Sequence, residues 1–391
     1  MASCLVAVIF LIFVSLGLPD SLLGSAWPQM RADFAVPSSY AGYVSMTICF
    51  MTIISSLLSP RLIQKVATKW ICVVSIALTI IGLLGFSFSP SYWFLFLFAV
   101  PYGLGAGSID ASINHYVANH YRSNIMNFLH CFYGLGAIIS PNLMGIALKV
   151  AHWNEGYRWT AYLQSAILLI VLLTLPLWKK TNPPSIEEKN EPVAGLKETI
   201  KVKGVFLTLL AFFSYCSAEG ISFLWTATYM GEIHSSLSPD LVASSGSLVF
   251  LGLMLGRLFA GFVSNRWGDR LLIRIGLMIE FIGIILIAIP ASSPLITAIG
   301  FAIMGLGMGP IYPSIQHMAP TNFGQRYSAS AIGMQMASAY VGSTFMPMIF
   351  GLAQQSLGIS ILPYVVLGFA ILNGTFLELA YRQIKRNRSL S

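Results

Sequence analysis

The stretch Gly103-Leu-Gly-Ala-Gly-Ser-Ile-Asp-Ala-Ser-Ile-Asn-His115 returns in the second half of the chain as Gly305-Leu-Gly-Met-Gly-Pro-Ile-Tyr-Pro-Ser-Ile-Gln-His317. The two copies align without a gap. Both lie in apolar runs long enough to cross a bilayer, since a transmembrane helix needs about 20 predominantly apolar residues. A motif shared by two such runs predicts a chain built from two similar halves.

Glycines and prolines extend the match to the next apolar run of each half. Gly136, Pro141 and Gly145 align with Gly342, Pro347 and Gly351. Small residues let transmembrane helices approach closely, so we interpret the glycines as packing residues. A proline bends a helix, and our hypothesis is that the matching bends assist a gating motion.

The composition excludes a soluble fold. Of 391 residues, 56% are hydrophobic and only 9% are charged, whereas a soluble domain carries about 25% charged residues. The net charge of +8 does not come from a basic arm or a basic helix, so nucleic acid is not an expected partner. The expected partner is the lipid bilayer. We expect a monomer with no cofactor and no metal.

Twelve apolar runs supply the predicted membrane spans. They lie at residues 4–27, 40–58, 70–86, 92–118, 125–148, 159–177, 205–229, 241–263, 271–289, 295–318, 328–352 and 361–379. The predicted fold class is an all-α integral membrane protein of twelve transmembrane helices. Its expected domains are an N-terminal six-helix bundle at 1–178, a polar cytoplasmic linker at 179–203 and a C-terminal six-helix bundle at 204–391.

Basic residues follow every even-numbered span. Arg61 follows the second span, Arg122 the fourth and Arg326 the tenth, and the linker and the C-terminal tail are also basic. Short loops rich in Lys and Arg remain in the cytoplasm. The pattern therefore predicts a multi-pass protein of the inner cell membrane with both termini in the cytoplasm.

The loop after the eighth span carries a further motif, Gly261-Phe-Val-Ser-Asn-Arg266-Trp-Gly268-Asp-Arg270. It resembles the cytoplasmic loop motif of the major facilitator superfamily at Gly261, Arg266, Gly268 and Arg270, while Asn265 and Asp269 depart from it. The corresponding loop after the second span is degenerate. The resemblance covers essentially the whole chain and implies two six-helix bundles that bind a substrate between them and work by alternating access.

Within that superfamily the first span resembles one branch in particular. The stretch Gly17-Leu-Pro-Asp20-Ser-Leu-Leu-Gly24-Ser-Ala-Trp27-Pro28, together with Asp110 in the fourth span, resembles the fucose-permease branch of sugar:proton symporters. That branch has Glu where this chain has Asp110. The resemblance implies that Asp20 and Asp110 take part in proton movement and sugar binding.

Five acidic residues lie inside predicted spans. A carboxylate at this depth costs at least a few kcal/mol, so each one is a functional hypothesis. Asp20, Asp110 and Glu219 are the predicted proton-coupling residues, and the alternative for each is a hydrogen-bonded structural acid. Glu280 and Glu378 are expected to pack or to snorkel toward the surface.

Sugars are bound by aromatic faces and by amide or carboxylate groups. The predicted substrate-binding residues are Trp27, Asn114, Asn127, His130, Trp225, Tyr312, Gln316, Gln335 and Tyr340. Asp110 and Asn114 share a helix face one turn apart, within expected reach of Asn127 or His130. Packing is the alternative for the aromatic residues.

For two basic side chains within spans, a gating role and a structural role are both open, the structural role of Arg257 being to anchor the eighth span. Arg257 is a basic residue well inside the eighth predicted span, and we expect it to pair with a carboxylate or a helix end. His317 lies near the cytoplasmic end of the tenth span, where capping a helix or gating are both open.

These features favour a secondary transporter that moves a small polar solute, a sugar, by alternating access coupled to protons, with sodium as an alternative ion. The alternative function is an exporter of drugs, sugars or a lipid-linked molecule. An enzyme is not expected, because the chain shows no Ser/His/Asp order, metal-ligand cluster or phosphate-binding glycine loop after a strand. A receptor would be expected to show an extra soluble domain, and none is indicated.

Overall fold

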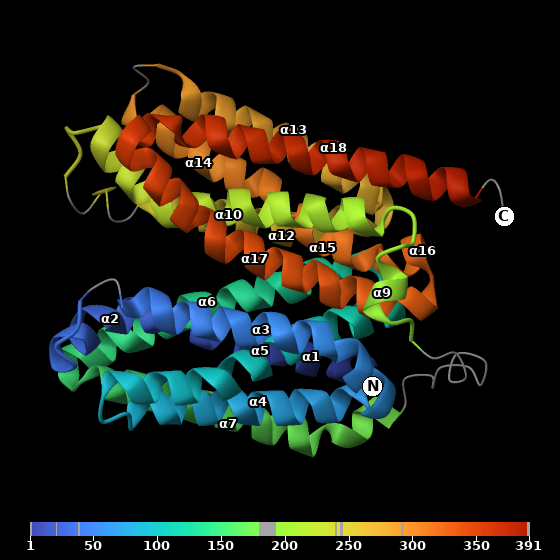
Figure 1. Cartoon of the computed structure of the whole chain (residues 1–391), viewed down its shortest axis with the longest axis horizontal. Helices are drawn as coiled ribbons and strands as arrows, with labels where there is room; N and C mark the ends of the chain where they lie inside the picture. The colour runs from blue at the N-terminus through green and yellow to red at the C-terminus, as the bar shows by residue number, and fades with distance from the viewer. Residues whose placement is uncertain are drawn as a thin grey trace. The chain divides into compact units, whose positions relative to one another are not determined.

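The computed structural model describes residues 2–20, 22–37, 40–179, 193–238, 241–242, 245–290 and 293–388, and these residues form helices without any strand. The helices of the first half are α1 (Ala2–Asp20), α2 (Leu22–Asp33), α3 (Tyr40–Lys65), α4 (Thr68–Ser87), α5 (Tyr92–His120), α6 (Ser123–Val150), α7 (Trp153–Leu173) and the 3-10 helix η1 (Leu175–Lys179). Those of the second half are α9 (Leu196–Thr199), α10 (Val205–Ile233), α12 (Leu248–Trp267), α13 (Asp269–Ala288), α14 (Pro294–Met308), α15 (Ile311–His317), α16 (Ala319–Phe323), α17 (Gln325–Leu357), η2 (Ile359–Ile361) and α18 (Leu362–Arg388) (Figure 1).

Twelve helical segments of the described chain are long and apolar enough to cross a membrane. The first segment contains α1 and α2, and the tenth contains α14 and α15. The predicted all-α fold with twelve transmembrane helices is therefore confirmed. The protein is a multi-pass membrane protein.

The helix ends differ from the predicted spans because apolarity does not mark where a helix stops. The last helix, α18, continues to Arg388 through polar residues, nine beyond the predicted end at 379. The helix of the eighth span begins at Leu248 rather than at 241, because Gly246 and Ser247 form a turn. Glycine and serine favour turns over helix interiors.

The chain divides into two compact units. Unit 1 contains Met1–Tyr116 and Leu129–Ala194, and unit 2 contains Val117–Phe128 and Gly195–Ser391. The segment from the end of α5 to the start of α6 thus groups with the C-terminal helices. The predicted linker, 179–203, lies partly outside the described residues, at 180–192, and its described part contains α9.

The repeated glycines occupy matching positions in the two units. In unit 1, a methyl group on Gly103 would lie 2.3 Å from the carbonyl oxygen of Ile48 in α3. In unit 2, a methyl group on Gly305 would lie 2.1 Å from the carbonyl oxygen of Val249 in α12. Only glycine allows backbones to approach this closely. The shared motif therefore sets the same helix contact twice.

The next glycine of the motif, two residues on, faces the following helix in each unit. A methyl group on Gly105 would lie 2.5 Å from the carbonyl oxygen of Ser75 in α4, and one on Gly307 would lie 2.5 Å from that of Gly276 in α13. By these contacts, α3 of unit 1 is the equivalent of α12 of unit 2, and α4 is the equivalent of α13.

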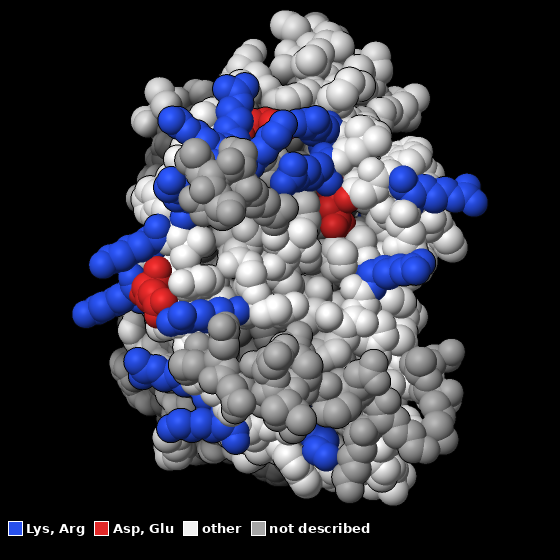
Figure 2. Space-filling view, turned by 90° about the vertical axis from the view of Figure 1, so that its right-hand side faces the viewer, with Lys and Arg blue, Asp and Glu red and all other residues white. Residues whose placement is uncertain are grey.

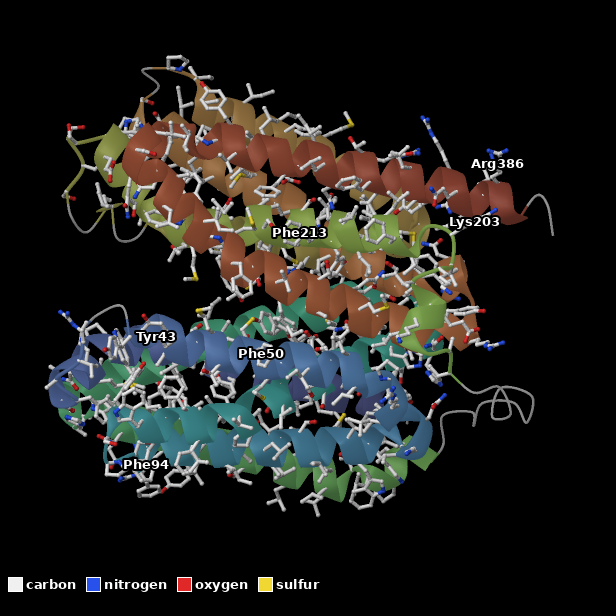
Figure 3. The ribbon with its side chains drawn as sticks, viewed as in Figure 1. Tyr43, Phe50, Phe94, Lys203, Phe213 and Arg386 are labelled. Atoms are coloured by element: carbon white, nitrogen blue, oxygen red, sulfur yellow. The ribbon has the colours of Figure 1, made fainter. Side chains whose placement is uncertain are left out.

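Large apolar side chains cover the outside of the helices. In unit 1, Tyr43 and Phe50 of α3 and Phe94 of α5 are exposed (Figure 3). In unit 2, Phe262 of α12 is 70% exposed. A soluble protein rarely exposes so many large apolar residues, whereas lipid solvates them.

Basic side chains gather at one end of the unit 2 helices. Lys203 and Arg386 lie at the same end of this unit (Figure 3), where the Gly204 amide donates to Gln383 Oε1 at 3.1 Å. On the face shown in Figure 2, the charged side chains are mostly Lys and Arg. The orientation of these ends in the membrane stays a prediction.

Candidate functional site

Asp20 ends α1, and its carboxylate accepts a hydrogen bond from Tyr133 of α6. The Tyr133 hydroxyl oxygen lies 2.5 Å from Asp20 Oδ2. The two helices meet nearby, where a methyl group on Gly17 would lie 2.1 Å from the Tyr133 carbonyl oxygen. Because only glycine permits this approach, Gly17 allows the Tyr133 ring to lie beside Asp20.

Asp20 is exposed although it belongs to the membrane-spanning segment Cys4–Asp33. Ionisable side chains within a membrane face protein or water rather than lipid. The Asp20 carboxylate is therefore expected to face protein groups or water.

A buried polar chain runs from Asp110 through Asn114 to His130 in unit 1. Asn114 donates from Nδ2 to Asp110 Oδ1 at 2.7 Å, and Asn114 Oδ1 lies 3.0 Å from His130 Nε2. All three side chains are buried. Because an amide oxygen only accepts hydrogen bonds, His130 Nε2 is the nitrogen that carries the proton in this arrangement. The amide thus connects a carboxylate of α5 with an imidazole of α6.

Asn127 and Trp27 do not join this chain. Asn127 donates from Nδ2 to the Ser123 carbonyl oxygen at 3.0 Å, and its buried Oδ1 has no hydrogen-bond partner among the described residues. Trp27 of α2 is buried, with its ring edge-on to Tyr92 at a centroid distance of 6.3 Å. These contacts favour the packing interpretation for Trp27.

In unit 2, Glu219 of α10 pairs with Arg257 of α12. Arg257 Nη2 lies 3.4 Å from Glu219 Oε1, and the Tyr215 hydroxyl, one turn earlier on α10, donates to the same oxygen at 3.2 Å. Tyr215 also reaches the Met308 carbonyl oxygen at 3.1 Å, where α14 ends. Arg257 therefore has the carboxylate partner that its position in a span requires.

Tyr312 and Gln316 of α15 both contact Met336 of α17. The Tyr312 hydroxyl lies 3.3 Å and Gln316 Nε2 3.9 Å from Met336 Sδ, which is a weak acceptor. The Oε1 atoms of Gln316 and of Gln335, next to Met336, are buried without a hydrogen-bond partner among the described residues. Buried amide oxygens usually bind protein groups or ordered water. This cluster therefore has unused capacity to accept hydrogen bonds.

Trp225 of α10 packs against α17. Its Nε1 donates to the Pro347 carbonyl oxygen at 3.0 Å, and its ring meets Phe350 edge-on at 5.6 Å. These contacts favour packing over ligand binding for Trp225. Tyr340 of α17 is half-buried, one turn beyond Met336.

The loop motif forms the turn between α12 and α13. Gly268 has φ +76° and ψ 156°, a conformation that only glycine adopts readily. A methyl group on Gly261 would lie 2.4 Å from Phe128 Cε1. Arg266 is exposed, and the Arg270 guanidinium lies 4.7 Å from the centre of the Tyr381 ring. These matching residues thus build and anchor a tight turn.

Asp269, which departs from the family motif, has two partners within unit 2. Its Oδ1 accepts a hydrogen bond from the Ser123 hydroxyl, and its Oδ2 lies 2.7 Å from His317 Nδ1. His317 Nε2 lies 3.0 Å from the Tyr121 carbonyl oxygen. Asp269 and His317 therefore hold the α5–α6 connection against α13 and α15.

Sequence reasoning missed three contributing residues, Tyr133, Tyr215 and Asp269. Tyr215 lies four residues before Glu219, a spacing that places both side chains on one helix face. Asp269 was visible only as a mismatch to the loop motif. Tyr133 left no signal, because the pairing of α1 with α6 depends on how two apolar helices are rotated.

Comparison with known proteins gives the family. The family model of the Major Facilitator Superfamily matches residues 9–239 and 207–390. Bypass of stop codon protein 6 of Saccharomyces cerevisiae is 22% identical over 390 residues, covering 90% of this chain and 77% of its own length. The glucose/mannose transporter GlcP of Bacillus subtilis is 23% identical over 312 residues, covering 75% of this chain and 74% of its own.

A solved structure agrees over nearly the whole fold. The outward conformation of FucP, the fucose:proton symporter of E. coli, superimposes with a TM-score of 0.78 at 16% identity, covering 97% of this chain and 98% of that one. Proteins of this family and fold are transporters and not enzymes. Because the family model spans almost all of the sequence, the chain belongs to the Major Facilitator Superfamily of membrane transporters.

Proposed function

We propose that the protein is a symporter that moves a small polar solute, a sugar, together with protons by alternating access. The observation that carries this proposal is Asp20, an exposed carboxylate within a membrane span that accepts a hydrogen bond from Tyr133. An acid with these properties has the means to load and release a proton. The names of the glucose/mannose transporter and the fucose:proton symporter support a sugar as the solute.

Asp20, Asp110 and Glu219 are the proposed proton-coupling residues. Proton loading of Asp20 or Asp110 would favour sugar entry and closure, because a ligand shifts a conformational equilibrium only through different affinities for the two states. Asp110 is linked to His130 through Asn114, so a change in its charge would reach the imidazole. Sodium is the alternative coupling ion.

The proposed sugar contacts divide by chemistry. Gln316 and Gln335 offer buried oxygens that sugar hydroxyls would satisfy, and the Tyr312 ring offers a flat face beside Gln316. In unit 1, Asn114 and His130 are the proposed polar contacts. The N-terminal bundle would thus hold most of the coupling acids, and the C-terminal bundle more of the aromatic and amide contacts.

The remaining proposals concern the protein in its membrane. It would lie in the inner cell membrane as a monomer, with both termini in the cytoplasm and the two bundles separated by the linker at 179–203. The basic loops that follow the even-numbered spans support this orientation.

Ligand-induced stabilisation of the purified protein tests the substrate class. A ligand that binds only the folded state raises its apparent stability in proportion to the logarithm of its concentration over Kd. Hexoses, pentoses, hexuronates and apolar drugs would be compared at about pH 6 and about pH 8. These values lie on either side of neutral pH, near which functional acids and bases usually titrate. Stabilisation by one sugar supports the proposal, and stabilisation by drugs alone would favour the exporter.

Uptake into proteoliposomes tests the coupling. With an imposed proton gradient, the wild type should accumulate the sugar found by thermal stabilisation, and a protonophore should abolish the accumulation. Asp20→Asn should lose accumulation while still exchanging labelled for unlabelled sugar, because exchange needs no net proton movement. Accumulation by Asp20→Asn at the wild-type level would refute the coupling role of Asp20.

A further inference from the structure

Glu280 is a buried carboxyl group without a hydrogen bond. It lies in the middle of α13, and its side chain is 2% exposed. No described residue forms a hydrogen bond with it, although burying an unpaired polar group costs several kcal/mol. Of the two alternatives expected for these acids, Glu280 therefore packs in the interior, whereas Glu378 reaches the surface and pairs there with Arg274.

Neighbouring helices bring polar residues to the turn of α14 that Glu280 contacts. The Tyr215 hydroxyl of α10, which donates to Glu219 Oε1, lies 3.1 Å from the Met308 carbonyl oxygen, next to Gly307. Arg257 of α12 and Glu280 both have their backbone nitrogens against α14, at Gly309 and Gly307 respectively. α14 itself contains no ionisable side chain.

Tyr229 of α10 donates to the Ile287 carbonyl oxygen near the end of α13 at 3.1 Å, whereas the charged groups packed on α13 lie close to its first turns. Asp269, at its first residue, contacts His317 of α15, and Arg274 is paired with Glu378 of α18 on the exposed surface. Neither pair interacts with Glu280 among the described contacts. The ionisable groups at this turn of α14 are therefore Tyr215 and Arg257, together with Glu219, the partner of both.

Charge balance favours a neutral Glu280 while Glu219 is ionised. Arg257 supplies one positive charge, and Glu219 Oε1, 3.4 Å from its Nη2, supplies one negative charge. A second carboxylate would leave an uncompensated negative charge inside the membrane, which is costly. A neutral Glu280 carries a proton and so becomes a hydrogen-bond donor.

The equivalent place in unit 1 shows what such a donor bonds to. Gly105 matches Gly307 in the repeat, and Thr79, four residues after Ser75, matches Glu280, four residues after Gly276. The Thr79 hydroxyl donates to Gln164 Oε1 at 3.0 Å. Gln164 in turn donates from Nε2 to the Ser15 carbonyl oxygen in α1 at 2.6 Å.

Unit 2 repeats this arrangement with one acceptor unused. Asn373 of α18, the last helix of its unit as α7 is of unit 1, donates from Nδ2 to the Ala211 carbonyl oxygen in α10 at 2.8 Å. Its buried Oδ1 has no hydrogen-bond partner among the described residues. The neutral hydroxyl–amide pair of unit 1 is thus replaced in unit 2 by an acid and an amide oxygen that has no hydrogen-bond donor among the described residues.

We propose that Glu280 holds an exchangeable proton, and that Glu219, paired with Arg257, passes protons to and from it. The Glu219 side chain is 14% exposed, so it has the access to water that Glu280 lacks. This site is a second proton-binding position beside those of unit 1, and it does not depend on the identity of the solute.

Infrared spectroscopy of the protein in lipid vesicles tests the proposal directly. A protonated carboxylic acid has a carbonyl band that a carboxylate lacks, and the band shifts when the proton is replaced by deuterium. In the wild type we expect such a band that Glu280→Gln removes and that Glu378→Gln, at a surface acid of the adjacent helix, leaves intact. The band should shift in heavy water, and Glu219→Gln should slow that shift.

A double variant distinguishes loss of the protonated group from loss of the folded structure. Glu280→Thr with Asn373→Gln copies the Thr79–Gln164 pair into unit 2, and it should fold with wild-type thermal stability while losing the band. A band that survives in Glu280→Gln or in the double variant would show that Glu280 is not the proton carrier. A band that does not shift in heavy water would show that its proton does not exchange. Neither measurement involves sugar binding, so a failure of this proposal can be distinguished from a failure of the proposed function.

Discussion

The Tyr133 hydroxyl donates a hydrogen bond to Asp20 Oδ2 across 2.5 Å, and this bond joins α6 to the end of α1. A hydrogen bond to a charged group contributes about 1.5–3 kcal/mol, so Tyr133 stabilises the ionised form of Asp20. The tyrosine therefore influences when Asp20 accepts a proton, without contributing a charge.

Replacing this hydroxyl tests its role in coupling. Tyr133→Phe should lower proton-driven solute uptake into proteoliposomes about tenfold or more, the factor that corresponds to a bond of this strength. Tyr157→Phe is the control, because its buried hydroxyl reaches only the weak acceptor Met30 Sδ, at 3.7 Å. Equal loss of uptake in both variants would mean that Tyr133 has only a packing role.

Two glycines of α6 that belong to the same repeat pattern should respond differently to alanine. A methyl group on Gly136 would lie 2.2 Å from the Val14 carbonyl oxygen, whereas one on Gly145 would have no neighbour within 4 Å. Gly136→Ala should destabilise the protein by about 1–3 kcal/mol, the usual cost of overpacking. Gly145→Ala should match the wild type or exceed it slightly in thermal unfolding in detergent. Equal stability of the two variants would contradict the α1–α6 contact.

The sequence predicted features that depend on composition and spacing along one helix. Hydropathy predicted twelve spans, and the motif at 103–115 and 305–317 predicted equivalent helices whose glycines make matching contacts. The spacing of Asp110 and Asn114 predicted one shared face, and their hydrogen bond confirms it.

Features that depend on helix rotation were not predictable in this way. A transmembrane helix is apolar on all sides, so hydropathy does not reveal which side faces a neighbour. For this reason the sequence left open whether Glu280 packs or snorkels, and whether Asn127 or His130 lies within reach of Asp110 and Asn114. The partners of Asp20 and Asp269 lie far away in sequence, where spacing carries no information.

Replacing only one residue of the Glu219–Arg257 pair should lower the stability of the protein more than replacing both. Arg257→Leu leaves the half-buried Glu219 carboxylate without its cationic partner, and such a loss costs up to about 3–5 kcal/mol in a buried pair. Adding Glu219→Gln should restore most of the lost thermal stability, because the unpaired charge is then gone. Arg274→Leu, which breaks the exposed pair with Glu378, should cost no more than about 1 kcal/mol. A double variant as unstable as Arg257→Leu alone would show that the arginine acts by packing.

Asp269→Ala should loosen the connection between α5 and α6. The substitution removes the hydrogen bonds to Ser123 and His317, each worth about 1.5–3 kcal/mol because the acceptor is charged. Amide hydrogen exchange at residues 119–125 should therefore accelerate at least about tenfold. Arg266→Ala, at an exposed position in the same loop motif, should leave that exchange unchanged. Unchanged exchange in Asp269→Ala would mean that the segment is held by other contacts.

Gln316→Leu should have opposite effects on stability and on ligand binding. Its Oε1 is buried without a partner among the described residues, so replacing the amide removes an unsatisfied group and should stabilise the empty protein by about 1–3 kcal/mol. If this amide binds the solute, the same variant should lose the stabilisation that the sugar gives the wild type.

Gln164→Leu provides the matched control for that prediction. The Gln164 amide accepts from Thr79 and donates to the Ser15 carbonyl oxygen, so its removal leaves buried groups unpaired and should lower the melting temperature while sugar still stabilises the protein. The two variants would then distinguish a residue that binds the ligand, Gln316, from a residue that stabilises helix contacts, Gln164. A Gln316→Leu protein that is less stable than the wild type and still responds to sugar would place Gln316 with Gln164 as a structural residue.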